Sequence, residues 1–271
     1  MGRHFNVNGI KLYYEDFGDP EAKETVAFFN GVMASVSSWE FIYPVFVKLG
    51  YRVILHDFKG QLRSDKPDGE YSFAGHAEEA RALFEFLGVK KLHIIGTSYG
   101  GEIAMKFAVL FPDMTKTISL IDSASETNEV MIGFVDSWKN LCDTGDSALF
   151  FTGMAPTIYG PRYMHEQSEQ LAARAKALKS ISPDFFAGQK ILYDTFKKDT
   201  HLTAELKKIS CPALVLCGED DILKPPEFSK IISDNIPDSE FLLIPGCGHV
   251  AIYEKPKELT SAILGFISKH A

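Results

Sequence analysis

The chain has 271 residues, of which 45% are hydrophobic, 24% charged and 12% aromatic, and its formal net charge at pH 7 is −8. These values are typical of a soluble globular protein and exclude the low hydrophobicity and high charge of a disordered chain. A nucleic-acid-binding protein needs a basic face to displace counterions from phosphates, so the acidic balance argues against that class.

Two features of the sequence bear on the compartment. The four cysteines, at positions 142, 211, 217 and 247, show neither C-x-x-C pairing nor the density of a disulfide scaffold. The first residues lack the apolar core of a signal peptide, and no apolar stretch approaches the roughly 20 residues that span a bilayer. We therefore expect a cytoplasmic protein with reduced cysteines and no membrane contact.

Strand-like segments alternate with helical patterns along most of the chain. Residues 3–16 predict two short strands joined at Asn8-Gly9, a dipeptide that supplies the positive φ angles of a tight hairpin turn. The further predicted strands are 25–29, 51–55, 92–95, 118–121, 213–217 and 241–244, and the predicted helices are 39–49, 102–111, 226–235 and 257–269. This alternation favours a mostly parallel sheet covered by helices on both faces.

The alternation breaks between about Ser123 and Lys208, where no clear strand pattern occurs. The segment instead contains helix-like stretches that are rich in aromatic residues. We expect a helical insertion between two strands of the main sheet. It divides the chain into a core domain, residues 1–122 and 209–271, and an inserted helical segment, residues 123–208.

A candidate nucleophile lies between the strand predicted at 92–95 and the helix predicted at 102–111. Residues 96–100 read Gly-Thr-Ser-Tyr-Gly, a G-x-S-x-G nucleophile elbow in its required strand–turn–helix context. A serine on so tight a turn needs glycines on both sides, because side chains there would collide with the neighbouring strand and helix. The following helix N-terminus places a positive dipole where an oxyanion would form. A phosphate-binding loop is the alternative, but the sequence lacks G-x-x-x-x-G-K-[ST], and residues 96–98 do not fit G-x-G-x-x-G.

A serine hydroxyl is a weak nucleophile until a base accepts its proton, and that base needs an orienting carboxylate. Of the eight histidines, His249 is the candidate base because it follows the last predicted strand, at the carboxyl edge of the sheet that also carries Ser98. His56, which ends a strand at the same edge, is the alternative base.

The candidate acids follow predicted strands as well. Asp221 is favoured because it leaves the turn after the penultimate strand long enough to bring its carboxylate back to His249. Asp220 is its competitor, and it would otherwise cap that turn or the next helix. Asp122, at the end of the strand 118–121, is the third candidate.

The chain order Ser98, Asp221, His249 differs from the orders of trypsin-like and subtilisin-like proteases. Over essentially its whole length the sequence resembles the α/β-hydrolase fold family, and within it the branch of small serine esterases, enol-lactonases and C–C hydrolases that carry a helical cap. The matching features are Asn30-Gly31 after a strand, Asp57…Gly60…Arg63-Ser64-Asp65-Lys66-Pro67, the elbow, Gly218…Asp221…Pro225, and Gly248-His249.

This resemblance implies an eight-stranded, mostly parallel sheet with a helical cap inserted after the sixth strand. It also implies an oxyanion hole made by the backbone N–H groups of Val32 and Tyr99. The sequence departs from the family at Asn30-Gly31, where His-Gly is usual. An asparagine can make similar local hydrogen bonds, so we expect the hole to persist with an altered shape. Leu62, in place of a usual glycine, alters a loop near the pocket without touching the catalytic residues.

The reaction expected from these residues is acyl transfer to water without a cofactor or metal. Ser98 attacks a carbonyl carbon, His249 moves the proton, and Asp221 orients the imidazole. The density of aromatic residues in the insertion predicts an apolar pocket for a small or medium-sized substrate. Its candidate lining residues are Met33, Trp138 and Tyr159, with Tyr99 a stronger candidate beside the nucleophile.

Other functions fit the same residues. A Ser-His-Asp triad can also cleave C–C bonds, open lactones, make peracids or remove N-terminal proline. A small-molecule receptor with a retained triad, or a scaffold with a decayed site, are alternatives outside enzymes. Haloalkane dehalogenases and epoxide hydrolases are disfavoured, because they need a carboxylate nucleophile where Ser98 stands. A monomer and a homodimer are both compatible with the sequence.

Overall fold

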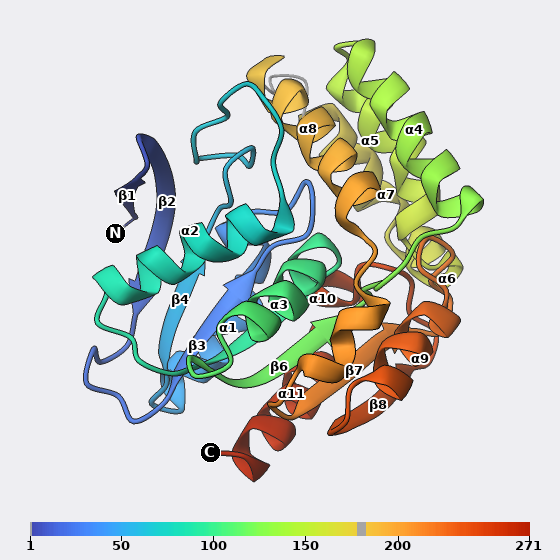
Figure 1. Cartoon of the computed structure of the whole chain (residues 1–271). Coiled ribbons are helices and arrows are strands. Elements are labelled where there is room, and N and C mark those ends of the chain that lie inside the picture. Colours follow the sequence, from blue (N-terminus) through green and yellow to red (C-terminus); the bar gives the residue numbers. More distant parts are fainter. Residues whose placement is uncertain (1, 178–182) are drawn as a thin grey trace.

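The computed structural model describes residues 2–177 and 183–271, and its eight strands form one sheet in the order β1-β2-β4-β3-β5-β6-β7-β8 (Figure 1). The pairs β1–β2 and β2–β4 are antiparallel and the other five pairs are parallel, which confirms the mostly parallel sheet predicted from the sequence. The strand bounds are β1 Arg3–Val7, β2 Ile10–Phe17, β3 Thr25–Phe29, β4 Arg52–His56, β5 Leu92–Thr97, β6 Thr115–Ile121, β7 Ala213–Gly218 and β8 Ser239–Ile244.

The first hairpin has the turn that its sequence predicts. Val7 pairs with Ile10, so Asn8 and Gly9 form a two-residue connection. Their φ angles are 52° and 81°. Two positive φ angles match the right-handed twist of the flanking strands, and asparagine followed by glycine adopts them at low cost.

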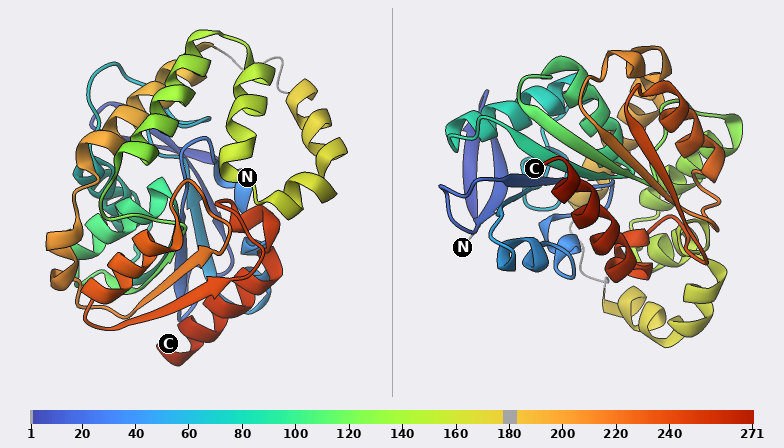
Figure 2. Two further views of the ribbon diagram at one scale, coloured as in Figure 1. Left: turned by 90° about the vertical axis from the view of Figure 1, so that its right-hand side faces the viewer. Right: turned by 90° about the horizontal axis from the view of Figure 1, so that it is seen from below.

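Helices cover both faces of the sheet, as the right-hand view of Figure 2 shows. Successive residues of a strand point to opposite faces, and in β3 Phe28 packs with one hydrophobic cluster while Phe29 packs with the other. The helices on the Phe29 face are α2 Phe73–Phe86, α3 Tyr99–Leu110 and α9 Pro226–Asn235. Those on the Phe28 face are α1 Tyr43–Lys48 and α11 Pro256–Lys269. The helix predicted at 39–49 is thus shorter, because a 3₁₀ turn, η1 Val36–Trp39, precedes α1.

In the described part of the segment between β6 and β7 there are five α-helices, which lie above one end of the sheet in Figure 1 and confirm the insertion after the sixth strand. Among the described residues of this segment there is no strand. Aromatic contacts join the inserted helices to one another, for example Trp138 with Tyr193 and Phe150 with Phe186. Their bounds are α4 Glu129–Asp143, α5 Ser147–Ile158, α6 Pro161–Glu166, α7 Ser168–Ala177 and α8 Pro183–Asp199.

Two short elements complete the chain, η3 Thr203–Lys208 before β7 and α10 Ala251–Glu254 before α11. The four cysteines are buried and none forms a disulfide. Along residues 2–177 and 183–271, no helix has both the length and the apolar composition needed to cross a bilayer.

Candidate active site

Ser98 lies on a strained turn between β5 and α3. Its φ and ψ angles are 51° and −122°, a conformation that residues other than glycine rarely adopt. Its neighbours explain why the elbow needs glycines. A Cβ on Gly96 would lie 2.5 Å from the backbone oxygen of Gly100, and a Cβ on Gly100 would lie 2.1 Å from the backbone oxygen of Phe29. The strained backbone therefore presents the Ser98 hydroxyl at the carboxyl end of β5.

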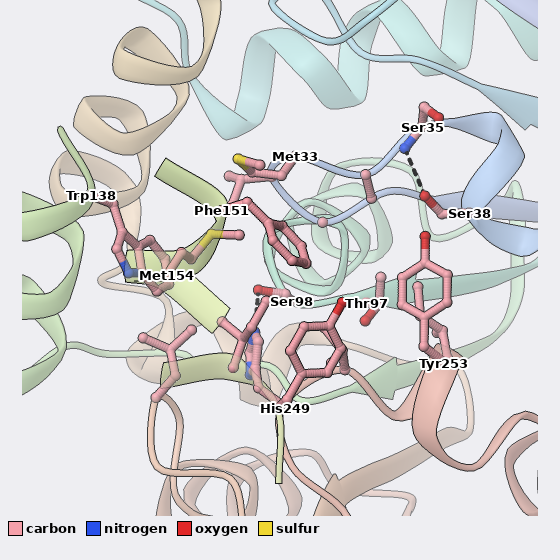
Figure 3. Close-up of a pocket in the computed structure, with 18 of the residues that line it drawn as sticks. Met33, Ser35, Ser38, Thr97, Ser98, Trp138, Phe151, Met154, His249 and Tyr253 are labelled. Carbon is pink, nitrogen blue, oxygen red and sulfur yellow. Dashed lines mark hydrogen bonds between the residues drawn. The ribbon is translucent and has the colours of Figure 1, made fainter. Parts of the chain in front are cut away.

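The side chains of Ser98, His249 and Asp221 form a hydrogen-bonded chain. His249 Nε2 lies 3.0 Å from Ser98 Oγ, and His249 Nδ1 lies 2.7 Å from Asp221 Oδ2. Figure 3 shows the imidazole pointing at the serine. The backbone N–H of His249 donates to the carbonyl of Ile158, at the end of α5. The histidine loop is thus held by an inserted helix as well as by the sheet.

Of the three candidate acids, Asp221 is the one whose carboxylate contacts the imidazole of His249. Its other oxygen, Oδ1, accepts hydrogen bonds from the backbone N–H groups of Leu223 and Lys224, which fix the carboxylate in the turn. Asp122 accepts a hydrogen bond from the backbone of Gly218 and so braces the end of β7. Burial, and next the nearby charge of Asp221, raise the pKa of Asp122. The backbone N–H of Asp220 donates to the carbonyl of Cys247.

His56, the alternative base, is remote from this arrangement. Its ring is fully buried and packs edge-on against Phe29 and Phe58. Neither ring nitrogen has a hydrogen-bond partner within the part of the chain that the structure describes. Burial lowers the pKa of His56 to about 3. A histidine held neutral in an aromatic cluster cannot take the proton of Ser98.

The loop after β3 is held by the side chain of Asn30. Its Nδ2 group is 2.8 Å from the His56 carbonyl, 3.2 Å from Asp57 Oδ1 and 3.1 Å from Gln61 Oε1, while its Oδ1 accepts from the indole N–H of Trp39. The asparagine thus makes the local hydrogen bonds expected at this position. Met33, three residues after Asn30, has a positive φ of 61°.

The sequence predicts an oxyanion hole made by two backbone amides, that of Val32 and that of Tyr99. Tyr99 is next to Ser98 in the chain, and Val32 is near it in space. Val32 lines the same cavity as Ser98. Tyr99 is the first residue of α3, a position whose N–H has no acceptor within the helix. The neighbouring amide of Met33 donates to Gln189 Oε1 at 2.8 Å, so α8 holds the loop that carries Val32.

A cavity of about 370 Å³ opens above Ser98 between the sheet and the inserted helices (Figure 3). Met33, Trp138 and Tyr159 line it, as predicted, and so does His249. The prediction that Tyr99 lines the pocket is wrong. Its side chain is buried and packs edge-on against Phe73 and His76, because α3 turns its first residue towards α2.

A second, much smaller cavity, about 20 Å³ in volume, also reaches Ser98. His249 is not among its lining residues. It is lined by Val32, Ser98, Met131, Val135, Trp138, Tyr193, Phe196, Leu223 and Lys224.

Two charged residues that contact the serine or its neighbour were not predicted from the sequence. Lys224 Nζ lies 3.3 Å from Ser98 Oγ and 2.8 Å from Glu102 Oε1. Burial raises the pKa of Glu102. Their positions in the sequence could have identified them. Glu102 lies one helical turn after the nucleophile, and Lys224 lies in the same turn as Asp221. A third missed residue is Arg174, which lines the larger cavity.

Within residues 2–177 and 183–271, no group of three or more His, Cys, Asp and Glu side chains is arranged to hold a metal ion.

Comparisons with known proteins agree with the fold and extend over nearly the whole chain. A family model described as alpha/beta hydrolase fold matches residues 24–256. A bifunctional esterase/perhydrolase of Acinetobacter calcoaceticus is 26% identical over 98% of this chain and 99% of its own. A 2-hydroxy-6-oxononadienedioate/2-hydroxy-6-oxononatrienedioate hydrolase of a Pseudomonas species is 25% identical over 97% of this chain and 93% of its own. The crystal structure of MGS-M2, an alpha/beta hydrolase enzyme from a Medee basin deep-sea metagenome library, has a TM-score of 0.93 and 26% identity over 98% of this chain and 97% of its own.

Proposed function

Because the chain belongs to the α/β-hydrolase fold family, we propose that it is a serine hydrolase that cleaves a carboxylic ester or related acyl compound through an acyl-enzyme intermediate. The observation that carries this proposal is the chain of contacts from Asp221 through His249 to Ser98, with distances of 2.7 and 3.0 Å. Base and nucleophile within hydrogen-bond reach, with the base held by a third group, are what nucleophilic catalysis by serine requires.

In the first step Ser98 Oγ attacks the carbonyl carbon while its proton passes to His249 Nε2. Asp221 holds the imidazole in the tautomer that accepts at Nε2 and stabilises the imidazolium that forms. The negative charge on the carbonyl oxygen is stabilised by the amides of Val32 and Tyr99, each such donor being worth roughly 3–4 kcal/mol. His249 then protonates the leaving group, and water releases the acyl group by the same steps.

The two cavities suggest how the substrate lies. The leaving group must be near His249, which protonates it, and His249 lines the larger cavity but not the smaller one. We therefore place the leaving group in the cavity of about 370 Å³ and the acyl group in the cavity of about 20 Å³. A cavity needs roughly 10–15 Å³ of such volume to admit one water molecule, so the smaller cavity favours an acetyl-sized acyl group over a long chain. The apolar walls of the larger cavity favour an apolar leaving group.

The inserted helices supply much of this wall, which supports dividing the chain into a core domain, residues 1–122 and 209–271, and a cap, residues 123–208. Trp138 of α4 and Met154 of α5 project into the cavity in Figure 3. A cap that closes the site over Ser98 would select substrates by the size and polarity of these side chains.

The test is turnover of p-nitrophenyl esters with acyl chains of increasing length by the wild type and Ser98→Ala. We expect Ser98→Ala to abolish turnover and the wild type to prefer the acetyl ester. Ser37→Ala is the matched control, since Ser37 also lines the larger cavity but makes its side-chain hydrogen bond with Ser35. Wild-type rates in Ser98→Ala would refute the proposal.

The same assay separates the alternatives. The relative named as a dienedioate hydrolase makes C–C cleavage the first alternative, and lactone opening and release of N-terminal proline use the same residues. Adding β-diketones, lactones and prolyl peptides to the panel identifies the preferred bond. A receptor would instead show a single slow event that leaves a covalent ligand on Ser98.

A further inference from the structure

The side chain of Lys224, like that of His249, contacts Ser98 Oγ. The ammonium of Lys224 lies 3.3 Å from that oxygen and 2.8 Å from Glu102 Oε1. The Lys224 and Glu102 side chains are only 2% and 0% exposed. The ring of Phe196 covers the ammonium, with its centroid 4.7 Å from Nζ. A complete ion pair is therefore enclosed against the nucleophile.

Stability gives no reason for this pair. Removing two charges from water costs several kcal/mol for each ion, and apolar replacements of a buried ion pair are often neutral or stabilising. Titratable groups in strongly perturbing surroundings occur preferentially at functional sites, and this pair touches the nucleophile.

The backbone ties the pair to the rest of the site. The backbone N–H of Lys224 donates to Asp221 Oδ1, so one short turn positions both the acid and the ammonium. Glu102 lies in the first turn of α3, directly after the elbow, and its Oε1 also accepts from the backbone N–H of Ala124. Both charges are thus held by the segments that position Ser98 and Asp221.

We propose that Lys224 is a further catalytic residue, whose ammonium donates a hydrogen bond to the Ser98 oxygen and stabilises the negative charge that this oxygen carries during the reaction. The inference rests on the proposed acyl-enzyme mechanism and adds a fourth side chain to it. Glu102 is a positioning residue that holds the ammonium against Ser98.

The contribution is greatest when the acyl-enzyme is hydrolysed. Water adds to the acyl carbon and gives a proton to His249, and the bond from the acyl carbon to Ser98 Oγ then breaks. The bonding electron pair goes to Oγ, which takes its proton from His249 Nε2. Lys224 keeps all its protons and only donates a hydrogen bond to the departing oxygen. Oxygen leaves more readily as its negative charge is better stabilised.

The experiment measures how fast the acetyl-enzyme decays. Enzyme is mixed with p-nitrophenyl acetate and quenched with acid at increasing times, and the intact mass reports the acetylated fraction. The test variant is Lys224→Met/Glu102→Gln, which removes both charges and so leaves no unpaired ion in the core. The matched control is Lys59→Met/Glu79→Gln, a largely buried pair at 2.6 Å whose lysine also lies over an aromatic ring, that of Tyr71.

We expect the acetyl-enzyme of the test variant to decay about tenfold to a hundredfold more slowly than that of the wild type, as for the loss of a hydrogen bond to a charged group. The control should decay at the wild-type rate. The inference about Lys224 is overturned if the folded test variant decays at the wild-type rate, or if the control is slowed equally. Either result leaves the proposed function standing. Absence of Ser98-dependent turnover in the wild type overturns the proposed function and this inference with it.

The single variant Glu102→Gln tests the positioning role. It keeps an oxygen that can accept from the backbone N–H of Ala124 but removes the negative charge that faces the ammonium. The acetyl-enzyme of Glu102→Gln should therefore decay more slowly than that of the wild type, whereas Glu102→Asp, which keeps the charge, should restore part of the lost rate. Decay of Glu102→Gln at the wild-type rate contradicts the role of Glu102.

Discussion

Asn30 shows how a single side chain can replace a family histidine. Its amide has hydrogen-bonding partners on β4, on the following loop and on η1, so the carboxamide joins the segments around the loop that carries Val32. Asparagine supplies both donor and acceptor groups at once, and neither depends on protonation. The substitution therefore preserves the loop without adding a group that titrates near neutral pH.

His56, the neighbour of that network, predicts how stability depends on pH. Burial lowers its pKa from 6.5 to about 3, so between these values the unfolded chain binds a proton that the folded protein does not. Stability therefore rises with pH through this window and is lost as the pH falls below 6.5. The expected loss from this residue is about 2 kcal/mol between pH 7.5 and pH 5.

The measurement is urea unfolding at both pH values for the wild type and His56→Phe. The phenylalanine variant should lose about 2 kcal/mol less than the wild type over this range. The same change at exposed His201 is the control and should leave the pH dependence unaltered. Equal pH dependence of the wild type and His56→Phe would show that His56 is charged in the folded protein.

At the scale of elements, the site is assembled from the ends of strands and from two inserted helices, α5 and α8. The elbow, the acid turn and the histidine loop follow β5, β7 and β8, whose carboxyl ends meet at one edge of the sheet. Gly218 lets two of these segments meet, since a Cβ there would lie 2.2 Å from the carbonyl oxygen of Gly248. Helix α8 adds a contact from outside the sheet, through Gln189.

We predict that Gln189→Met lowers kcat for acetyl esters about threefold to tenfold. The variant leaves the Met33 amide without its partner at 2.8 Å, and a net hydrogen bond is worth about 1 kcal/mol. The loop then holds the neighbouring Val32 amide less firmly against the oxyanion. Steady-state kinetics check this, with Lys190→Met on the same helix as the control.

Lys190 pairs with Asp143 in a partly exposed salt bridge, the kind of contact that contributes little. Wild-type kcat in Lys190→Met is therefore expected. Wild-type kcat in Gln189→Met would show that α8 does not influence the oxyanion loop.

At the scale of the whole molecule, the inserted helices and the sheet share one hydrophobic core. A single cluster of buried side chains contains Ile103 of α3 and Leu120 of β6 together with Phe150 and Leu192 of the inserted helices. The two ends of the insertion also meet, because the backbone N–H of Leu202 donates to the carbonyl of Ser125 at 2.7 Å. The inserted helices therefore pack against the sheet through a shared hydrophobic core.

Shared packing predicts that the sheet and the inserted helices unfold in one transition. The two tryptophans report on the sheet and on the inserted helices. Trp39 packs on the Phe28 face of the sheet, and Trp138 lies on α4. In Trp39→Phe the remaining fluorescence follows the inserted helices, and in Trp138→Phe it follows the core. Each variant should show the same urea midpoint by fluorescence and by far-UV circular dichroism. An earlier fluorescence midpoint in Trp39→Phe alone would show that the inserted helices unfold first.

Much of the fold was predictable because its signals are local. Strand and helix periodicity follows from which face each residue buries, and the Asn8-Gly9 hairpin and the elbow follow from φ angles and steric limits. Tyr99 was misplaced because chain proximity to Ser98 says nothing about the direction of its side chain. The contacts of Lys224 and Glu102 could not be predicted because they join residues that are far apart in the chain.

The sequence by itself determined the order of the elements, the strained turn at Ser98, and the choice of His249 and Asp221 as its candidate partners, since each depends on short-range patterns and on strand ends. Only the tertiary structure decided which carboxylate reaches the imidazole, how the two cavities divide the space around the serine, and that a buried ammonium contacts its oxygen. Those features change when the distance between separate segments changes by a few tenths of an ångström. Such distances are set by the packing of the whole chain.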